Sequence, residues 1–412
     1  MKNLSSKIKS YVNGLITWNW IVILLIAVFQ KMSHLMMTTP TGPFADSIGL
    51  TGTVIGTAAS IYTFACILTR PFAGTLTDRV SPKKLLAVVF IMRALTCVLY
   101  TMTNSMPMFF LTRFMQGVCF AALGSCIPAI NSRCVSRAAL GMSYSIMAAL
   151  QKLLSALAPV WARTLYTDYG FTEAYLAAGA VSLVPVALVF LLRENKEAEA
   201  EAIESSAKKE KKPFNPLKGI CWSALGIAGL GFFLIVPYYA TDMFGMLYYD
   251  AKGMNYATGL AVASGVGVIY GLFVGALVDA FRKKPAILII PALCMLSGCL
   301  LIHAYATETW QMTLACCIYY FGWNACEPII LSTLFRIVPK DQAGAASSTW
   351  FLALDLSGLI MNPVVGVLGD SLGYAGTFKA CALAPVIAFV IFLLFGMPKI
   401  RKANLSADEA AA

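Results

Sequence analysis

The sequence has few charged residues and few residues suited to catalysis. Only 12% of its 412 residues are charged and 59% are hydrophobic, whereas a soluble domain carries about 25% charged residues. It has two histidines, and no two of its twelve cysteines form a C-x-x-C pair. Motifs of the G-x-S-x-G, H-E-x-x-H and phosphate-binding glycine-rich kinds are missing as well. We therefore expect neither a water-soluble fold nor an enzyme, and no metal or cofactor.

Long apolar runs recur about every 30 residues along the chain. A helix needs about 20 mostly apolar residues to cross a bilayer, and its backbone must satisfy its own hydrogen bonds there. The first run is too long for the apolar part of a signal peptide, and the period-2 alternation of a barrel is absent. The sequence thus predicts an all-α membrane protein with twelve transmembrane helices, at 17–43, 51–76, 85–103, 107–130, 142–165, 173–192, 219–246, 257–280, 286–305, 311–335, 345–368 and 380–398.

The positive charge of the chain is distributed unevenly between the predicted loops. The net charge is +11, and 23 of the 31 lysines and arginines fall in the termini and loops of one side, whereas the other side has only Lys252 and Lys379. Positively charged loops stay in the cytoplasm, so the pattern predicts a multi-pass protein of the inner (plasma) membrane with both termini cytoplasmic. It also explains the net charge without nucleic acid, which we do not expect as a partner.

A charged segment divides the chain into two apolar halves. Residues 193–218 are first acidic and then basic, which is typical of a solvated linker. We therefore predict four parts: an N-terminal six-helix bundle at 1–192, a cytoplasmic linker at 193–218, a C-terminal six-helix bundle at 219–398 and a disordered cytoplasmic tail at 399–412.

The two halves repeat each other at a nearly constant offset. The pattern G-x-L-x-D at 74–78 recurs as G-x-L-x-D at 275–279, an offset of 201 residues. The pattern R-x-V at 133–135 recurs at 336–338, an offset of 203, and the Ala-Pro pair at 158–159 corresponds to Asn-Pro at 362–363, an offset of 204. An internal duplication of this length is typical of secondary transporters built from repeats.

Three motifs give the chain a resemblance to a known family. The segment 74–83, GTLTDRVSPK, fits the pattern G-x-L-x-D-R-x-G-R-K between helices two and three, except that Ser and Pro replace its second Gly and the following Arg. The segment 113–117, RFMQG, fits the R-x-x-Q-G pattern of the fourth helix. The exporter motif G-x-x-x-G-P-x-x-G-G is eroded at 154–163 and better kept at 358–366. With these motifs and the repeat, the chain resembles a major facilitator superfamily transporter of the bacterial twelve-helix efflux-like branch.

The resemblance implies two pseudo-symmetric six-helix bundles and a gate on the cytoplasmic side. The gating residues would be Gly74, Asp78 and Arg79, with Gly275 and Asp279 as their repeat equivalents. A carboxylate at a helix end, such as that of Asp78, can accept backbone N–H bonds or pair with a cation of another helix. The alternative is that the basic residues of this loop only set the topology.

Charged residues inside the spans are segregated between the halves. Each costs roughly 2.5–3.5 kcal/mol at a helix centre, so such residues face a cavity or a partner. The deep cations all lie in the first half and the deep acids all lie in the second. They are Lys31, Arg93, Arg113 and Lys152 in the first half, and Asp242, Glu327 and Asp355 in the second.

Spans one, four, five, seven, ten and eleven line a central cavity in the family that the chain resembles. The resemblance therefore implies two walls of substrate-binding residues, and it places the coupling proton on Glu327 and Asp355 of the second wall. The substrate-binding residues would be Lys31, His34, Arg113, Gln116, Gln151 and Lys152 on the first wall, with Trp323 and Asn324 on the second.

Structural interpretations of the same residues remain open. Arg113 and His34 could be packing residues, and Arg93 lies on an outer span, where structural pairing is favoured. The tyrosines at 238–239 and 319–320 are more often packing residues than ligand contacts. The deep cations of the first half could also pair with the deep acids of the second half as a structural lock, instead of binding substrate.

We expect a secondary active transporter that moves a small organic solute by alternating access and is coupled to protons. A cationic wall favours a solute with an anionic group. The alternatives are a multidrug-type exporter, an exporter of a metallophore or amino-acid-like metabolite, and, more remotely, a membrane solute sensor. The expected partners are the small-molecule substrate, protons and the lipid bilayer, and the protein is expected to be a monomer.

Overall fold

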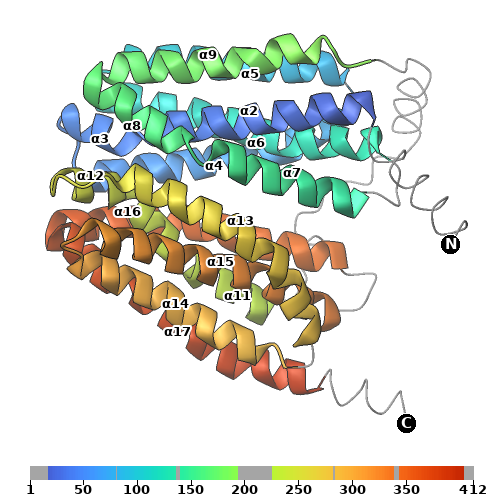
Figure 1. Ribbon diagram of the computed structural model, residues 1–412, viewed down its shortest axis with the longest axis vertical. Coiled ribbons are helices and arrows are strands. Elements are labelled where there is room, and N and C mark those ends of the chain that lie inside the picture. The colour runs from blue at the N-terminus through green and yellow to red at the C-terminus, as the bar shows by residue number, and fades with distance from the viewer. Residues whose placement is uncertain are drawn as a thin grey trace, which may run out of the picture. The chain divides into compact units, whose positions relative to one another are not determined.

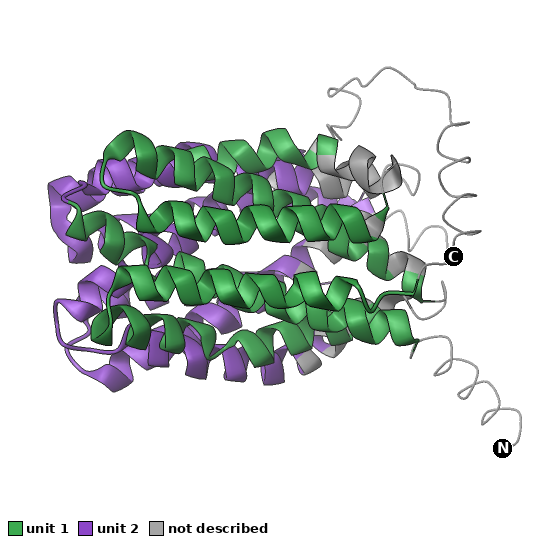
Figure 2. Cartoon of the chain, turned by 90° about the horizontal axis from the view of Figure 1, so that it is seen from above, with its two compact units in different colours: residues 1–48, 61–212 green, residues 49–60, 213–412 purple. Residues whose placement is uncertain are grey.

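The computed structural model describes residues 17–79, 81–135, 140–193, 225–281, 284–337 and 343–402. Every regular element within these ranges is a helix, and no strand occurs there (Figure 1). The expectation of an all-α fold is therefore confirmed. The chain packs as two compact units, coloured separately in Figure 2: unit 1 is residues 1–48 with 61–212, and unit 2 is residues 49–60 with 213–412.

Unit 1 is a bundle whose helices begin at recognisable capping residues. The Thr17 side chain accepts a hydrogen bond from the Trp20 backbone N–H (3.1 Å), which caps the first helix. Prolines stand in the first turn of three further helices, where a missing N–H costs nothing. The helices are α2 (Trp18–Thr38), α3 (Thr41–Ser47), α5 (Pro82–Thr101), α6 (Met106–Cys134), α7 (Leu140–Ser155), α8 (Ala158–Asp168) and α9 (Phe171–Val189).

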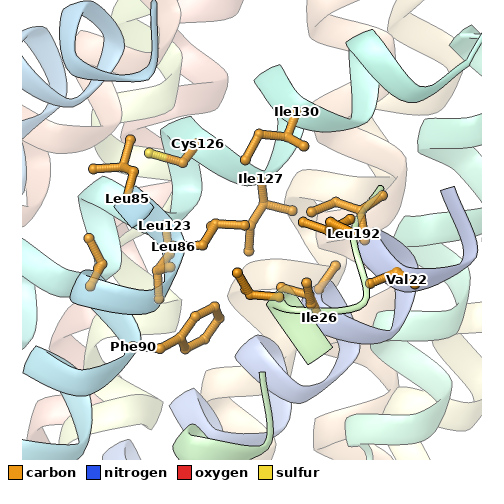
Figure 3. Packing of buried hydrophobic residues seen from close by; sticks show 14 of the residues in the cluster. Val22, Ile26, Leu85, Leu86, Phe90, Leu123, Cys126, Ile127, Ile130 and Leu192 are labelled. Atoms are coloured by element: carbon orange, nitrogen blue, oxygen red, sulfur yellow. The ribbon is translucent and has the colours of Figure 1, made fainter. Parts of the chain in front are cut away.

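The core of unit 1 is formed by apolar side chains of α2, α5 and α6. Figure 3 shows Ile26 of α2, Phe90 of α5 and Leu123 of α6 in one cluster, and all three are fully buried. Within a membrane such a core stabilises the bundle through close packing of side chains, because lipid tails are as apolar as leucine.

Unit 2 has its own core and its own bundle. Its core centres on Leu296 of α14 and the fully buried Trp350 of α16. Gly373, with φ of +67°, interrupts the long helix α16, so the predicted spans 345–368 and 380–398 lie on either side of a kink. The helices are α11 (Leu225–Leu234), α12 (Val236–Asp250), α13 (Tyr256–Ala280), α14 (Ala286–Tyr305), α15 (Thr309–Ile337), α16 (Ala343–Cys381), α17 (Leu383–Ile391) and a π-helical turn at Phe392–Gly396.

Helix α4 (Gly52–Arg79) is shared between the two units. Its residues up to Ser60 pack in unit 2 and the remainder packs in unit 1, although the helix is continuous. The predicted division of the chain at 192 and 219 would place all of α4 in the N-terminal bundle, and that division stays a prediction. In the predicted topology, which stays a prediction, the part of α4 that packs in unit 2 would be its external end.

A helix or a pair of helices lies at each of the twelve predicted spans. Eight stretches of the described chain are long and apolar enough to cross a membrane, and the last of them, Thr349–Lys402, contains two predicted spans. The predicted span 142–165 is divided into α7 and α8, neither of which is long enough alone. The count of twelve crossings therefore stays a prediction. Residues 397–402 are helical, and most of the predicted linker and tail lies outside the described residues.

Candidate functional site

A polar group around Arg113 lies among the apolar helices of unit 1. The Arg113 Nη1 donates to Gln116 Oε1 at 3.0 Å, one turn further along α6, and the guanidinium lies 5.1 Å from the centroid of the Tyr62 ring. The buried Tyr100 hydroxyl donates to the same Gln116 oxygen at 2.7 Å. Gln116 therefore orients Arg113, and the R-x-x-Q pattern has a local structural reason: its two polar residues share a helix face.

Helix α2 brings two more predicted site residues to the same region. Lys31 is half-buried, and His34, one turn later, is buried with its ring stacked on Phe120 at a centroid distance of 4.6 Å. His34 lies within electrostatic reach of Lys31, Arg113 and also Arg93. Unit 1 thus brings Lys31, His34, Arg113, Gln116 and Arg93 together, and the role of the predicted ones in binding substrate stays a prediction.

Helix α7 positions Gln151 and Lys152 differently from one another. The Gln151 Nε2 donates to the backbone oxygen of Ala27 at 2.9 Å, so this amide joins α7 to α2. Lys152 is exposed in the last turn of α7, where a cation is favourable to the helix dipole. Gln151 therefore has a packing contact that the sequence does not predict, and a role for it in binding substrate stays a prediction.

The predicted residues of unit 2 lie on α15 and α16. The buried Asn324 donates from Nδ2 to the backbone oxygen of Gly267 at 3.3 Å, and the half-buried Trp323 packs against the core of the unit. Glu327 and Asp355 are both half-buried. Their role as carriers of the coupling proton stays a prediction.

A further acid of unit 2 lies among tyrosines. Asp242, on the exposed face of α12, is within electrostatic reach of Tyr238, Tyr239, Tyr319 and Tyr320. From the sequence, Asp242 is a deep acid and the tyrosines are more often packing residues. Tyr238 and Asp242 are four residues apart on one helix, so the sequence alone already indicates that these two side chains are neighbours. Aromatic faces and a carboxylate together suit the positive group of a ligand.

The N-terminal part of α4 packs closely on α16 inside unit 2, with backbone atoms of the two helices nearly in contact. A Cβ added to Gly56 would collide with the backbone oxygen of Asn362, and one added to Gly366 would collide with the backbone oxygen of Gly52. Small residues recur every four positions on α4, at Gly52, Gly56 and Ser60, and small residues are what lets membrane helices approach closely.

Asp370 of α16 caps the N-terminus of α4. Its Oδ1 accepts from the Gly52 backbone N–H (2.6 Å), and its Oδ2 accepts from the Thr53 backbone N–H (2.7 Å) and hydroxyl (2.5 Å). Asp370 lies beyond the predicted span 345–368. Its partial burial alone would raise its pKa. The hydrogen bonds from Thr53 and Gly52 outweigh that effect and lower the pKa. The carboxylate is therefore ionised at neutral pH and stabilises the positive end of α4.

The predicted gating residues at the cytoplasmic side have helical backbones. Gly74, Asp78 and Arg79 belong to α4, and Gly275 and Asp279 belong to α13. Their side chains lie outside the described part of the structure. Their role in gating stays a prediction.

The fold and the polar groups within its apolar helices define a multi-pass helical membrane protein. The chain belongs to the major facilitator superfamily, because the family model "Major Facilitator Superfamily" matches residues 20–362, a range that includes helices of both units. The resemblance inferred from the sequence motifs is thereby confirmed.

Three known proteins illustrate what the chain is similar to. It is 20% identical to the staphylopine export protein of Staphylococcus aureus, over 92% of this chain and 97% of that protein. It is 21% identical to multidrug resistance protein 2 of Bacillus subtilis, over 84% of this chain and 87% of that protein. The crystal structure of the nucleoside transporter NupG matches with a TM-score of 0.71 at 14% identity, over 92% of this chain and 99% of that one, and this match supports the fold alone.

Proposed function

We propose that this protein is a secondary active transporter that moves a small organic solute with an anionic group by alternating access. The observation that carries the proposal is the gathering of Lys31, His34 and Arg113 within the apolar helices of unit 1. Cations are expensive in a membrane, and a cluster of them is retained where it meets a negative charge. A carboxylate or another anionic group on the solute supplies such a charge during the transport cycle.

Coupling to protons is the second part of the proposal. Glu327 and Asp355 are half-buried acids on helices that line the cavity in this family. We propose that one of them takes up a proton in one state of the transport cycle and releases it in another.

Alternating access gives a role to the shared helix α4. Its external end packs on α16 in unit 2, and its other end packs in unit 1. We propose that the contact between α4 and α16 closes the external side and that it separates when that side opens. The predicted gate at Asp78 would act at the opposite end of the same helix.

A second candidate function is export of a metallophore-like, amino-acid-like or multidrug-type compound. The similarity to an export protein and to a multidrug resistance protein favours it, and Asp242 among its tyrosines suits the positive group of a zwitterion. Transport in proteoliposomes of the purified protein tests both candidates. The panel would contain carboxylates, amino acids and amphipathic drugs, with and without a pH gradient.

We expect flux of an anionic or zwitterionic solute that responds to the pH gradient. Flux of only cationic amphipathic drugs would favour the multidrug function. Binding without flux of any compound would instead support the solute sensor and contradict transport.

The topology gives a prediction that needs no substrate. In a variant without the native cysteines, cysteine reporters at Ser206 and Ala411 should react only from the cytoplasm, and a reporter at Lys252 only from outside, because of the distribution of lysine and arginine. Membrane-impermeant maleimide added to intact cells and to inverted vesicles measures this. A reporter at Ser206 that reacts from outside would contradict both the twelve-helix topology and the inner-membrane orientation.

A further inference from the structure

Arg93 is a buried cation whose hydrogen-bonding groups are unsatisfied. It lies on α5 three residues after Phe90, which Figure 3 shows in the core of unit 1, and only 1% of its surface is exposed. None of its Nε, Nη1 and Nη2 atoms has a hydrogen-bond partner among the described residues. Arg113, in the same unit, differs because it is hydrogen-bonded to Gln116.

Among the described residues, the groups recorded as acting electrostatically on Arg93 include no carboxylate. The groups within its electrostatic reach are Cys97, Cys119 and Tyr62, together with His34. A guanidinium stays charged in proteins and presents five N–H donors in a planar fork. Leaving such a group buried without acceptors is costly, so its retention calls for an acceptor in another state of the protein.

A second orphaned donor lies close to this cluster. The Nε2 atom of the fully buried Gln116 also has no partner among the described residues, although its oxygen accepts from both Tyr100 and Arg113. Arg93 and Gln116 thus both have donor atoms without an acceptor among the described residues. An anion with two oxygen atoms is the kind of ligand that such a set lacks.

We propose that Arg93 is a substrate-binding residue that holds a carboxylate group of the transported solute through its planar guanidinium. This inference rests on the proposed function and extends it, because it adds a residue of α5 to the predicted substrate wall and specifies a planar oxyanion. Lys31 and Arg93 both lie within electrostatic reach of His34, so an anion held by Arg93 would also be attracted by Lys31.

The first test uses the purified full-length protein without any solute. Arg93→Met removes an unpaired charge and keeps a similar volume, so its melting temperature should equal or exceed that of the wild type. Arg113→Met is the matched comparison: it removes a guanidinium that is hydrogen-bonded to Gln116 and stacked on Tyr62, and should melt at a lower temperature. An Arg93→Met protein that is unfolded or clearly less stable than the wild type would show that a protein acid pairs with Arg93, and would overturn the proposal.

The second test measures the rise in melting temperature caused by sodium succinate, citrate and glutamate, with sodium chloride at equal ionic strength as the control. The wild type should be stabilised by at least one carboxylate, Arg93→Met should lose that response, and Arg93→Lys should require on the order of tenfold more ligand because it lacks the bidentate fork. An equal response of the wild type and Arg93→Met, or an equal response of the wild type to chloride, would overturn the proposal.

The two tests separate the failure of this inference from failure of the proposed function. If the wild type responds to none of the carboxylates and transports no anion, the proposed function itself fails, and Arg93 has no carboxylate to hold. If the wild type responds and Arg93→Met responds equally, only the assignment of Arg93 fails.

Discussion

Gly56→Leu should reduce transport to less than about a tenth of the wild-type rate while the protein remains folded in the membrane. The Cβ of any larger residue at this position would meet the backbone oxygen of Asn362 on α16, and overpacking a close contact costs about 1–3 kcal/mol. An energy of that size shifts a two-state equilibrium by roughly fivefold to 150-fold. The conformation in which α4 packs on α16 would therefore be depleted, and alternating access would stop.

Hydrogen exchange of the backbone amides measures this effect where it should occur. Peptides covering 49–60 and 358–370 should exchange faster in Gly56→Leu than in the wild type, whereas peptides of α9 should not change. Gly265→Leu is the matched control, because this glycine of α13 has nothing within 4 Å of an added Cβ. Unchanged exchange and transport in Gly56→Leu would contradict a closing role for the contact.

Asp370→Asn should have the same effect in a weaker form. The amide keeps the shape of the carboxylate but loses its charge at the N-terminus of α4, which is worth about 0.3–1 kcal/mol. One of its two accepting atoms also becomes a donor that faces a backbone N–H of Gly52 or Thr53. Exchange at 49–60 should rise by a factor of a few, in the direction of Gly56→Leu.

The helical fold could be predicted from the sequence because the signal is long and repeated. Apolar runs of about 20 residues leave the backbone no alternative to helix in a membrane, and the duplication and motifs identify the family. The positions where helices are divided were not predictable from hydropathy: α7 ends at Ser155 and α8 begins at Ala158, within one apolar run. Such a break depends on local backbone geometry, to which an average over a window is insensitive.

The candidate site was predictable only where residues lie on one helix. Arg113 and Gln116, or Lys31 and His34, are one turn apart, so their common face follows from the sequence. The hydrogen bond from Gln151 to Ala27 and the burial of Arg93 depend on how α7, α2, α5 and α6 pack, and hydropathy does not specify that packing.

The close contact of α4 with α16 could be predicted only in part from the sequence. Gly358, Asn362 and Gly366 are the residues in which the second half keeps an exporter-type motif, and Gly52, Gly56 and Ser60 repeat the same spacing of four. Spacing shows that each helix can approach another closely, but not which helix it approaches. Asp370 is an acid at a predicted span end, and its role as a cap required the position of the Gly52 and Thr53 amides.

The largest remaining effect is expected from Lys152 and Asp355, two charges that the sequence places within predicted spans. If Lys152 attracts the anionic group of the solute, Lys152→Gln should lose binding of anionic solute, by tenfold or more, with the fold intact. If Asp355 carries the coupling proton, Asp355→Asn should still bind and exchange solute but lose the response to a pH gradient. If Glu327 carries it instead, Glu327→Gln should show that loss. These results follow from separate roles for the cation and the acid.

The structural lock predicts a different pattern for the same three proteins. Removing one member of an ion pair within the membrane leaves the other charge uncompensated, which is destabilising, whereas removing both costs little. Under that hypothesis Lys152→Gln and Asp355→Asn would each be unstable, and the double variant would recover the stability of the wild type. Melting temperature and pH-driven uptake, measured side by side for the two single variants and the double variant, therefore decide between the hypotheses. Recovery of both stability and uptake in the double variant would eliminate the role of Lys152 in binding solute. If Lys152 bound the solute, removing Asp355 as well could not restore the lost binding.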